Sequence, residues 1–117
     1  MTELDFDGIS LGDDGVVKLA VVLPLCAKLT ELRLVSTQLG DKGAAALAGA
    51  IKGNGALTKL FLNDNQIGDA GAAALADALH VNGTLTVLGL GGNQIGEDAK
   101  SKLQEAVQGQ SGFQLRL

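Results

Sequence analysis

The stretch L-F-L-N-D-N-Q-I-G-D-A-G, from Leu60 to Gly71, mixes leucines, asparagines, acids and glycines in one short run. Taken alone, it is compatible with a calcium loop, with a phosphate-binding glycine loop, or with neither. The rest of the chain distinguishes between these interpretations, because the same residue types recur on both sides of the stretch at a spacing of 28 residues. The recurring columns include Leu32, Leu60 and Leu88; Leu34, Leu62 and Leu90; Leu39, Ile67 and Ile95; and Gly40, Gly68 and Gly96. Chance does not keep so many columns in phase, so the stretch belongs to a repeated unit.

The spacing extends toward both ends of the chain. T-E-L-D-F at Thr2 aligns with T-E-L-R-L at Thr30, and the chain closes on a strand-like F-Q-L-R-L. A chain of 117 residues is enough for one domain with a modest core. We predict a single domain over residues 1–117, with repeats at about 1–28, 29–56, 57–84 and 85–112 and a terminal strand at 113–117.

Each unit contains two hydrophobic periods. At its opening, Leu60 and Leu62 lie two residues apart, which is typical of a strand with one buried face. In its second half, Gly71, Leu75 and Leu79 lie four apart, which is typical of one face of a helix. One unit cannot bury its apolar faces alone, but stacked copies can. We therefore predict an α/β solenoid with a parallel sheet on the concave side and helices on the convex side.

Written as one line, the unit reads L-x-x-L-x-L-x-x-N-x-I-G-D-x-G-A-x-x-L-A-x-A-L. It resembles the leucine-rich repeats of the ribonuclease-inhibitor type, which are also found in NOD-like receptors and in Ran GTPase-activating proteins. The resemblance covers essentially the whole chain and implies a leucine-rich-repeat solenoid, shaped as a short arc or horseshoe. It also implies protein partners in signalling or regulation. It names none of them, because proteins that share a scaffold differ in what they bind.

Polar residues follow each predicted strand at fixed positions. Asn65 and Asn93 come just after their strands, where a side-chain amide can bond backbone groups of the turning chain. We predict a structural asparagine ladder at this position. Thr37 and Ile9 replace the asparagine in repeats two and one, so we expect a looser ladder toward the N-terminus. The aspartates just ahead of the helices are predicted to be helix N-caps: Asp13, Asp41 and Asp69.

Two ligand-binding loops are excluded by this assignment. A calcium loop requires D-x-[DN]-x-[DN]-G and a distal glutamate, and the opening stretch lacks that spacing. G-L-G-G-N-Q-I-G, from Gly89 to Gly96, looks like a phosphate-binding loop, but no strand–GxGxxG–helix register fits it. We expect its additional glycines to leave the concave face bare: Gly89, Gly91 and Gly92.

Composition narrows the partners and the compartment. The net charge is −4, acids and bases are interspersed, and aromatics make up 3% of the chain, so we expect no nucleic-acid partner. The N-terminal residues lack the apolar segment of a signal peptide, and no apolar run approaches the length of a membrane span. We therefore expect a cytoplasmic protein that does not bind membranes. The single cysteine, Cys26, is consistent with a reducing compartment.

No set of residues predicts catalysis. His80 is the only histidine and is predicted to lie in the loop after a helix, two repeats away from Cys26. A Cys–His pair would need a third group to orient it, and the sequence offers none. One histidine and one cysteine with acids at unrelated spacing build no metal site. We predict a protein that is not an enzyme and that takes no cofactor and no metal.

The outward strand positions vary between repeats while the leucine and glycine columns stay constant, as expected of a surface whose residues are not needed for folding. The predicted partner-binding residues on the concave face are Glu31, Arg33, Lys59, Phe61 and Asn63. An outward Phe61 adds nothing to the core, and beside Arg33 it resembles a small hot spot with an aromatic anchor and a polar rim. A lone exposed apolar residue is the alternative interpretation. The predicted function is non-catalytic protein binding through this face.

The ends of the stack leave alternatives open. No obvious capping module precedes the first strand, although terminal repeats normally carry a polar cover. Three alternatives remain open. The chain is a fragment of a larger regulatory or GTPase-activating repeat protein, a small protein whose charged ends prevent association, or a structural module that self-associates through uncapped ends. The acids of the first strand and the basic residue of the last are compatible with head-to-tail contact: Glu3, Asp5, Asp7 and Arg116.

Overall fold

Short strands and longer helices alternate along the chain, as the two hydrophobic periods predict. The computed structural model describes residues 2–117. The strands are β1 (Glu3–Asp5), β2 (Glu31–Arg33), β3 (Lys59–Phe61), β4 (Val87–Gly89) and β5 (Gln114–Arg116). The helices are α1 (Gly12–Val22), α2 (Asp41–Lys52), α3 (Asp69–Val81) and α4 (Glu97–Ala106), and a short 3-10 helix, η1 (Leu23–Leu25), follows α1.

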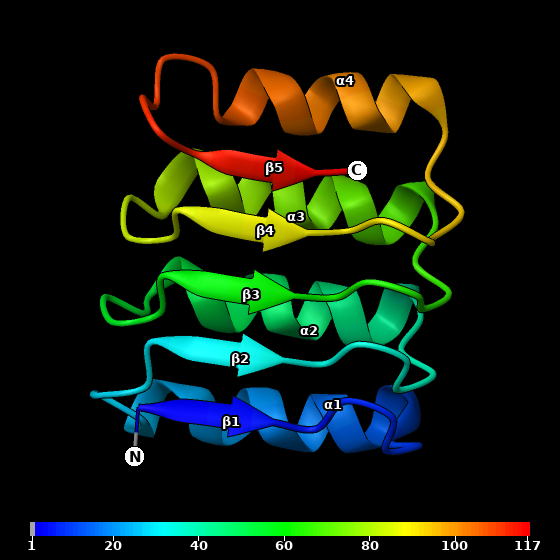
Figure 1. The fold of residues 1–117 in the computed structure, drawn as a ribbon, viewed down its shortest axis with the longest axis vertical. Coiled ribbons are helices and arrows are strands. Elements are labelled where there is room, and N and C mark those ends of the chain that lie inside the picture. The colour runs from blue at the N-terminus through cyan, green and yellow to red at the C-terminus, as the bar shows by residue number, and fades with distance from the viewer. Residues whose placement is uncertain (1) are drawn as a thin grey trace.

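The strands form one parallel sheet in the order β1-β2-β3-β4-β5, so each repeat lies beside its neighbours in sequence (Figure 1). Leu32 faces Leu60, which faces Leu88, and the 28-residue step therefore holds as far as β4. The last step is one residue shorter, because Leu88 pairs with Leu115. A strict 28-residue step would have placed Arg116 there, with a charged side chain pointing into the core.

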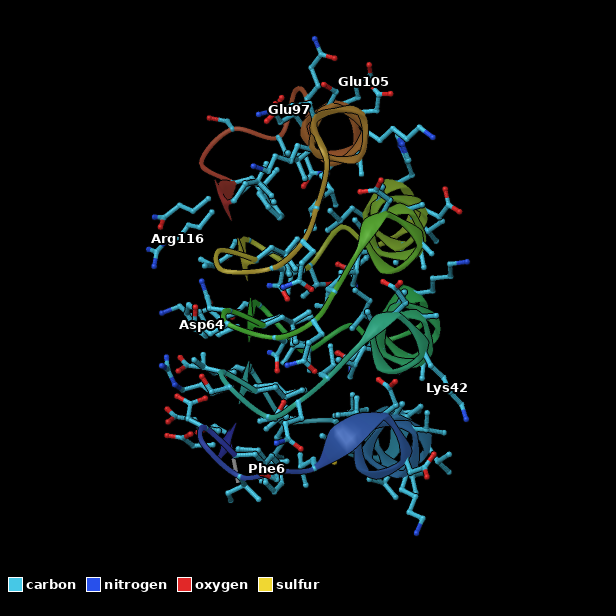
Figure 2. The ribbon with its side chains drawn as sticks, turned by 90° about the vertical axis from the view of Figure 1, so that its right-hand side faces the viewer. Phe6, Lys42, Asp64, Glu97, Glu105 and Arg116 are labelled. Atoms are coloured by element: carbon cyan, nitrogen blue, oxygen red, sulfur yellow. The ribbon has the colours of Figure 1, made fainter. Side chains whose placement is uncertain are left out.

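The four helices cover one face of the sheet and leave the other uncovered (Figure 2). Figure 2 also shows the helices spread farther apart than the strands. Neighbouring strands lie about 4.8 Å apart, whereas packed helices need roughly 8–10 Å. This difference in width bends the stack, so that the sheet is the concave face and the helices form the convex face of a leucine-rich-repeat solenoid.

The core between the two layers is aliphatic. Leu60 and Leu62 of the opening stretch are fully buried, and so are their equivalents Leu32 and Leu34. Burying one such side chain contributes about 1.5–3 kcal/mol, so the rows of leucines supply most of the folding energy that a chain so poor in aromatics can obtain. The other large and fully buried side chains include Leu23, Leu29, Leu39, Leu47, Ile51, Leu57, Ile67 and Leu75.

Small residues let neighbouring helices approach closely. A Cβ atom built on Gly71 of α3 would lie 3.0 Å from the Cβ of Ala44 in α2. Alanine and glycine on the facing surfaces therefore set the distance between helices of adjacent repeats. Within residues 2–117, no helix has both the length and the apolar character needed to cross a membrane.

Candidate interaction surface

The parallel register sorts the outward side chains of the concave face into rows across the sheet. One row contains Glu3, Glu31, Lys59, Val87 and Gln114, and the next contains Asp5, Arg33, Phe61, Gly89 and Arg116. The structure thus brings Glu31, Arg33, Lys59 and Phe61 together on adjacent strands β2 and β3. Asn63 follows Phe61 by two residues and is half-buried on the same side.

Arg33 is the centre of an ion-pair cluster. Its Nε donates a hydrogen bond of 2.9 Å to Oδ2 of Asp7 and lies 4.0 Å from Oδ2 of Asp5, while its Nη1 lies 4.0 Å from Oε2 of Glu31. The hydrogen bond to Asp7 is the main cause that raises the pKa of Arg33, against the opposing effect of burial. Oδ1 of Asp7 also accepts a hydrogen bond from the backbone N–H of Val35, so this carboxylate bonds both Arg33 and the segment that follows β2.

The ring of Phe61 packs against Arg33 on one side and against Gly89 on the other. The guanidinium carbon of Arg33 lies 4.7 Å from the centre of the Phe61 ring, within the range of a cation–π contact. On the opposite side, a Cβ atom on Gly89 would lie 3.3 Å from Cδ1 of Phe61 and 2.5 Å from Oδ1 of Asn63. Gly89 is buried as a result. The expectation that the glycines leave the face bare is therefore wrong at Gly89, because side chains of β3 fill its space.

Charge is unevenly divided over the concave face. At the β1–β2 end, Asp5, Asp7 and Glu31 lie within 4.0 Å of Arg33, and Glu3 adds a further acid beside Glu31, so the acids outnumber the base. Lys59 on β3 and Arg116 on β5 are exposed, with Gly89 between their strands. Figure 2 shows Arg116 on the strand side of the molecule, away from the helices. The face therefore offers an acidic end, a half-buried aromatic ring and an exposed lysine on its middle strand, and an exposed arginine at the β5 end.

Asn65 and Asn93 hold the chain at the point where it leaves the strand. Nδ2 of Asn65 donates to the carbonyl of Leu62 in its own repeat, at 3.0 Å, and to that of Leu34 in the preceding repeat, at 2.8 Å. Its Oδ1 accepts hydrogen bonds from the backbone N–H groups of Thr37 and Leu39. The Asn65 amide, which also donates to the carbonyl of Asn63, therefore bonds backbone groups of two repeats.

Asn93 repeats this arrangement one unit later. Its Nδ2 donates to the carbonyls of Leu62 and Leu90, and its Oδ1 accepts from the N–H of Ile67. In repeat two the hydroxyl of Thr37 donates to the carbonyl of Leu34 in the same repeat and, within residues 2–117, to no carbonyl of repeat one. Ile9, in the corresponding position of repeat one, is 50% exposed.

A second pair of asparagines lies at the opposite edge of the sheet, between helix and strand. Asn82 is buried, donates to the carbonyls of Ile51 and Asn54, and accepts from the N–H groups of Thr84 and Leu85. Asn54 makes the equivalent bonds within its own loop. Their 28-residue spacing was a signal in the sequence for a second inter-repeat contact.

The predicted helix caps act on a different helix. Asp41 is the first residue of α2, whose cap position is Gly40 and lacks a side-chain cap. Oδ1 of Asp41 instead accepts hydrogen bonds from the N–H groups of Gly68 and Gly71, at the start of α3, at 2.7 and 2.9 Å. Asp13 contacts the start of α2 in the same way, and Asp69 bonds Gly96 ahead of α4. Each aspartate thus caps the helix of the next repeat, because that terminus lies beside its carboxylate in the stack.

The remaining candidate residues stay apart. Sγ of Cys26 lies 3.5 Å from the carbonyl of Val22, and His80 is exposed in the last turn of α3 rather than in the following loop. Within residues 2–117, no three histidine, cysteine, aspartate or glutamate side chains are grouped so that they could hold a metal ion. A shallow hollow on α4 is lined by Ser101, Gln104, Glu105 and Gln108.

Comparisons with known proteins identify the same architecture. The model of a family described as "Leucine Rich repeat" matches residues 25–48 and 54–76. Among solved structures, actin-binding site 2 of leiomodin-1 is similar to this chain, with a TM-score of 0.86 and 23% sequence identity. The similarity covers 99% of this chain and 69% of that chain. A comparison with curated proteins found no match.

Proposed function

We propose that this chain is a non-catalytic protein-binding module and that the concave sheet face is its contact surface. One observation carries the proposal. The buried row Leu32, Leu60 and Leu88 is the same residue on three strands, whereas the adjacent outward row differs on every strand: Asp5, Arg33, Phe61, Gly89 and Arg116. Packing against the helices does not select these outward residues, so another role, recognition of a partner, is available to them.

The face is favoured over the edge of the sheet as the binding surface. β1 has only three residues, and Oδ1 of Asp5 accepts the hydrogen bond of the Asp7 N–H at 2.9 Å. A group on the open edge is thereby satisfied, and the acids of β1 would repel an acidic strand. Short, charged edge strands resist strand addition. The same features oppose the alternative function, self-association through the ends of the sheet.

Actin is the first partner to test. The similar leiomodin-1 structure is named for an actin-binding site, and its fold covers nearly all of this chain. We also assign the repeats to the ribonuclease-inhibitor type, because each 28-residue unit carries a full helix on the convex side. Cosedimentation with filamentous actin and titration with monomeric actin decide whether actin is the partner. If neither experiment detects binding, actin is excluded as the partner, and the contact surface is then tested with other proteins.

The contact surface is tested by site-specific photocrosslinking. A photoreactive side chain at Lys59, exposed on the concave face, is expected to capture the partner. The same group at Gly49, exposed on α2 with no neighbour within 4 Å, is the matched control on the convex side. Capture from Gly49 but not from Lys59 would place the binding surface on the helices and contradict the proposal.

Phe61→Ala is expected to weaken partner binding about tenfold and to lower the free energy of unfolding by less than about 1 kcal/mol. The ring is half-buried on the outward side, so its loss removes the Arg33 contact without opening the core. Titration calorimetry and urea unfolding measure the two effects. Phe6→Ala is the control, because Phe6 packs against the core and its loss should reduce stability instead. A large loss of stability in Phe61→Ala would show that Phe61 serves the fold.

A further inference from the structure

The end of α1 carries exposed aliphatic side chains that the core does not use. Leu25 is 82% exposed, Val21 is 72% exposed, and Val22 is 45% exposed. Val21 and Leu25 are four residues apart across the end of α1 and η1, so their side chains lie near the same face of the helical segment. We call these three residues the α1 patch. Single exposed apolar residues are ordinary, but three within five positions form a group.

The other repeats show that the positions of Val21 and Leu25 do not require aliphatic residues, whereas the position of Val22 is taken by Ala50 and Ala78, which pack in or against the core. One repeat later, the positions of Val21 and Leu25 are occupied by Gly49 and Gly53, and both are exposed. Two repeats later, Asp77 replaces Val21 and is exposed as well. Repeats two and three have neighbours on both sides, and these positions still face solvent. Stacking of a further repeat would therefore leave Val21 and Leu25 uncovered on the convex side.

The charges around the α1 patch select the chemistry of its partner. Residues 15–30 contain two lysines, Lys18 and Lys28, and no acid, in a chain whose net charge is −4. Lys52, at the end of α2, adds a third exposed base on the neighbouring helix. The nearest acid along α1 is Asp14, which lies 3.7 Å from the Nζ of Lys42. Two copies of the chain joined through this patch would bring their lysines together, which disfavours a dimer.

We propose that the α1 patch is a second interaction surface and that it binds an acidic amphipathic helix of a partner protein. Apolar side chains of that helix would cover Val21, Val22 and Leu25, and its acids would meet Lys18, Lys28 and Lys52. The patch lies on the convex side, so the concave face stays free. Taken with the concave contact surface proposed above, on which this step rests, the α1 patch would let one molecule join two others, one on each face of the solenoid.

The test uses a designed peptide of about 15 residues with leucines along one helical face and glutamates elsewhere. Titration of the isotope-labelled full chain is followed by NMR. The expected result is that the largest shift changes fall on residues 17–29 and 50–54 and that binding weakens as salt is raised. The double variant Val21→Asp, Leu25→Gly is expected to bind about tenfold more weakly, while retaining the wild-type melting temperature. Both replacements already occur at these positions in the other repeats, as Asp77 and Gly53.

Val81→Gly is the matched control, because Val81 occupies the Leu25 position in repeat three and is 66% exposed without a valine at position 77. Its affinity is expected to equal that of the wild type. Absence of binding, shift changes elsewhere, or equal binding of a peptide with lysines in place of the glutamates would overturn the proposal. So would a concentration-dependent dimer that the double variant abolishes, because the occupant would then be a second copy. None of these outcomes bears on the concave face, which the crosslinking experiment tests separately.

Discussion

At the scale of single residues, the buried side-chain amides connect one repeat to the next. Asn65 satisfies backbone groups of repeats two and three, and within residues 2–117 no buried side-chain nitrogen or oxygen atom lacks a hydrogen-bond partner. Its position after the strand could be predicted from the L-x-L-x-x-N pattern alone. The repeat that its amide would reach could not, because a column in the sequence gives no direction along the stack.

Asn65→Ala is expected to lower the free energy of unfolding by about 2–4 kcal/mol, because it leaves buried donors of Thr37 and Leu39 and the carbonyl of Leu34 without their partner. Urea unfolding followed by circular dichroism measures the change. Asn63→Ala is the matched control, since Asn63 lies two residues away and its side chain is half-buried on the outward face. A similar loss in both variants would show that the turn, not the amide network, is being disturbed.

The concave face was the least predictable part of the sequence at this scale. Alternation within the strands indicated that Arg33 and Phe61 point outward, and the register places them opposite each other. The alternation could not indicate that Asp7 would bond Arg33, or that the side chain of Phe61 would lie against Gly89. These contacts depend on how long side chains tilt across neighbouring strands, which hydrophobic periodicity does not encode.

At the scale of helices, stability depends on contacts between neighbours more than on each helix alone. The sequence predicted where the helices run, because alanines and leucines repeat at helical spacing. It placed the aspartate caps on the wrong helix, since a local capping rule assumes that the carboxylate bonds its own terminus. Asp41 bonds the next repeat instead, and Gly71 leaves the space for that bond. Ala99 replaces this glycine in α4, and among the described residues Asp69 is bonded only to Gly96.

Two glycine-to-alanine substitutions in helices should have opposite effects on the free energy of unfolding. In Gly71→Ala the new Cβ would lie 2.7 Å from Oδ1 of Asp41 and 2.9 Å from Cγ2 of Ile67, so we expect a loss of about 1–3 kcal/mol. In Gly49→Ala the Cβ meets nothing within 4 Å, so we expect a gain of about 0.5–1 kcal/mol from helix propensity. Chemical unfolding of both variants checks the pair. Equal changes of the same sign would contradict the close inter-repeat contact.

At the scale of the whole molecule, the stack is a row of similar interfaces whose ends differ from its middle. Leu60 lies at the centre with no exposed surface, whereas Leu4 in β1 is only half-buried. The repeat period alone predicted this layered architecture and the parallel sheet. It did not predict the shortened step before β5, although the sequence carries a signal for it: Leu115 and Leu117 follow Leu88 and Leu90 by 27 residues instead of 28.

Truncation of strand leucines should have an effect that depends on position in the stack. Leu60→Ala is expected to lower the free energy of unfolding by about 2–5 kcal/mol, and Leu4→Ala by roughly half as much, because less apolar surface is lost at the end. Urea denaturation gives both values, and native-state hydrogen exchange should show β1 opening before β3. Equal losses would mean that the end repeat is as tightly covered as the centre.

The aspartates bond the next repeat and the asparagines bond the preceding one, and these contacts also govern how such a chain can be lengthened. A second copy of residues 57–84 inserted after residue 84 would find every partner it needs, since its Asn65 and Asp69 would meet the same backbone groups that their counterparts meet now. Reversing the unit, or adding a part of it, would leave those groups facing the wrong neighbours. The protein can therefore be lengthened by whole repeats without new residues at the junctions. In the same way, a tandem duplication of one repeat would keep these inter-repeat hydrogen bonds.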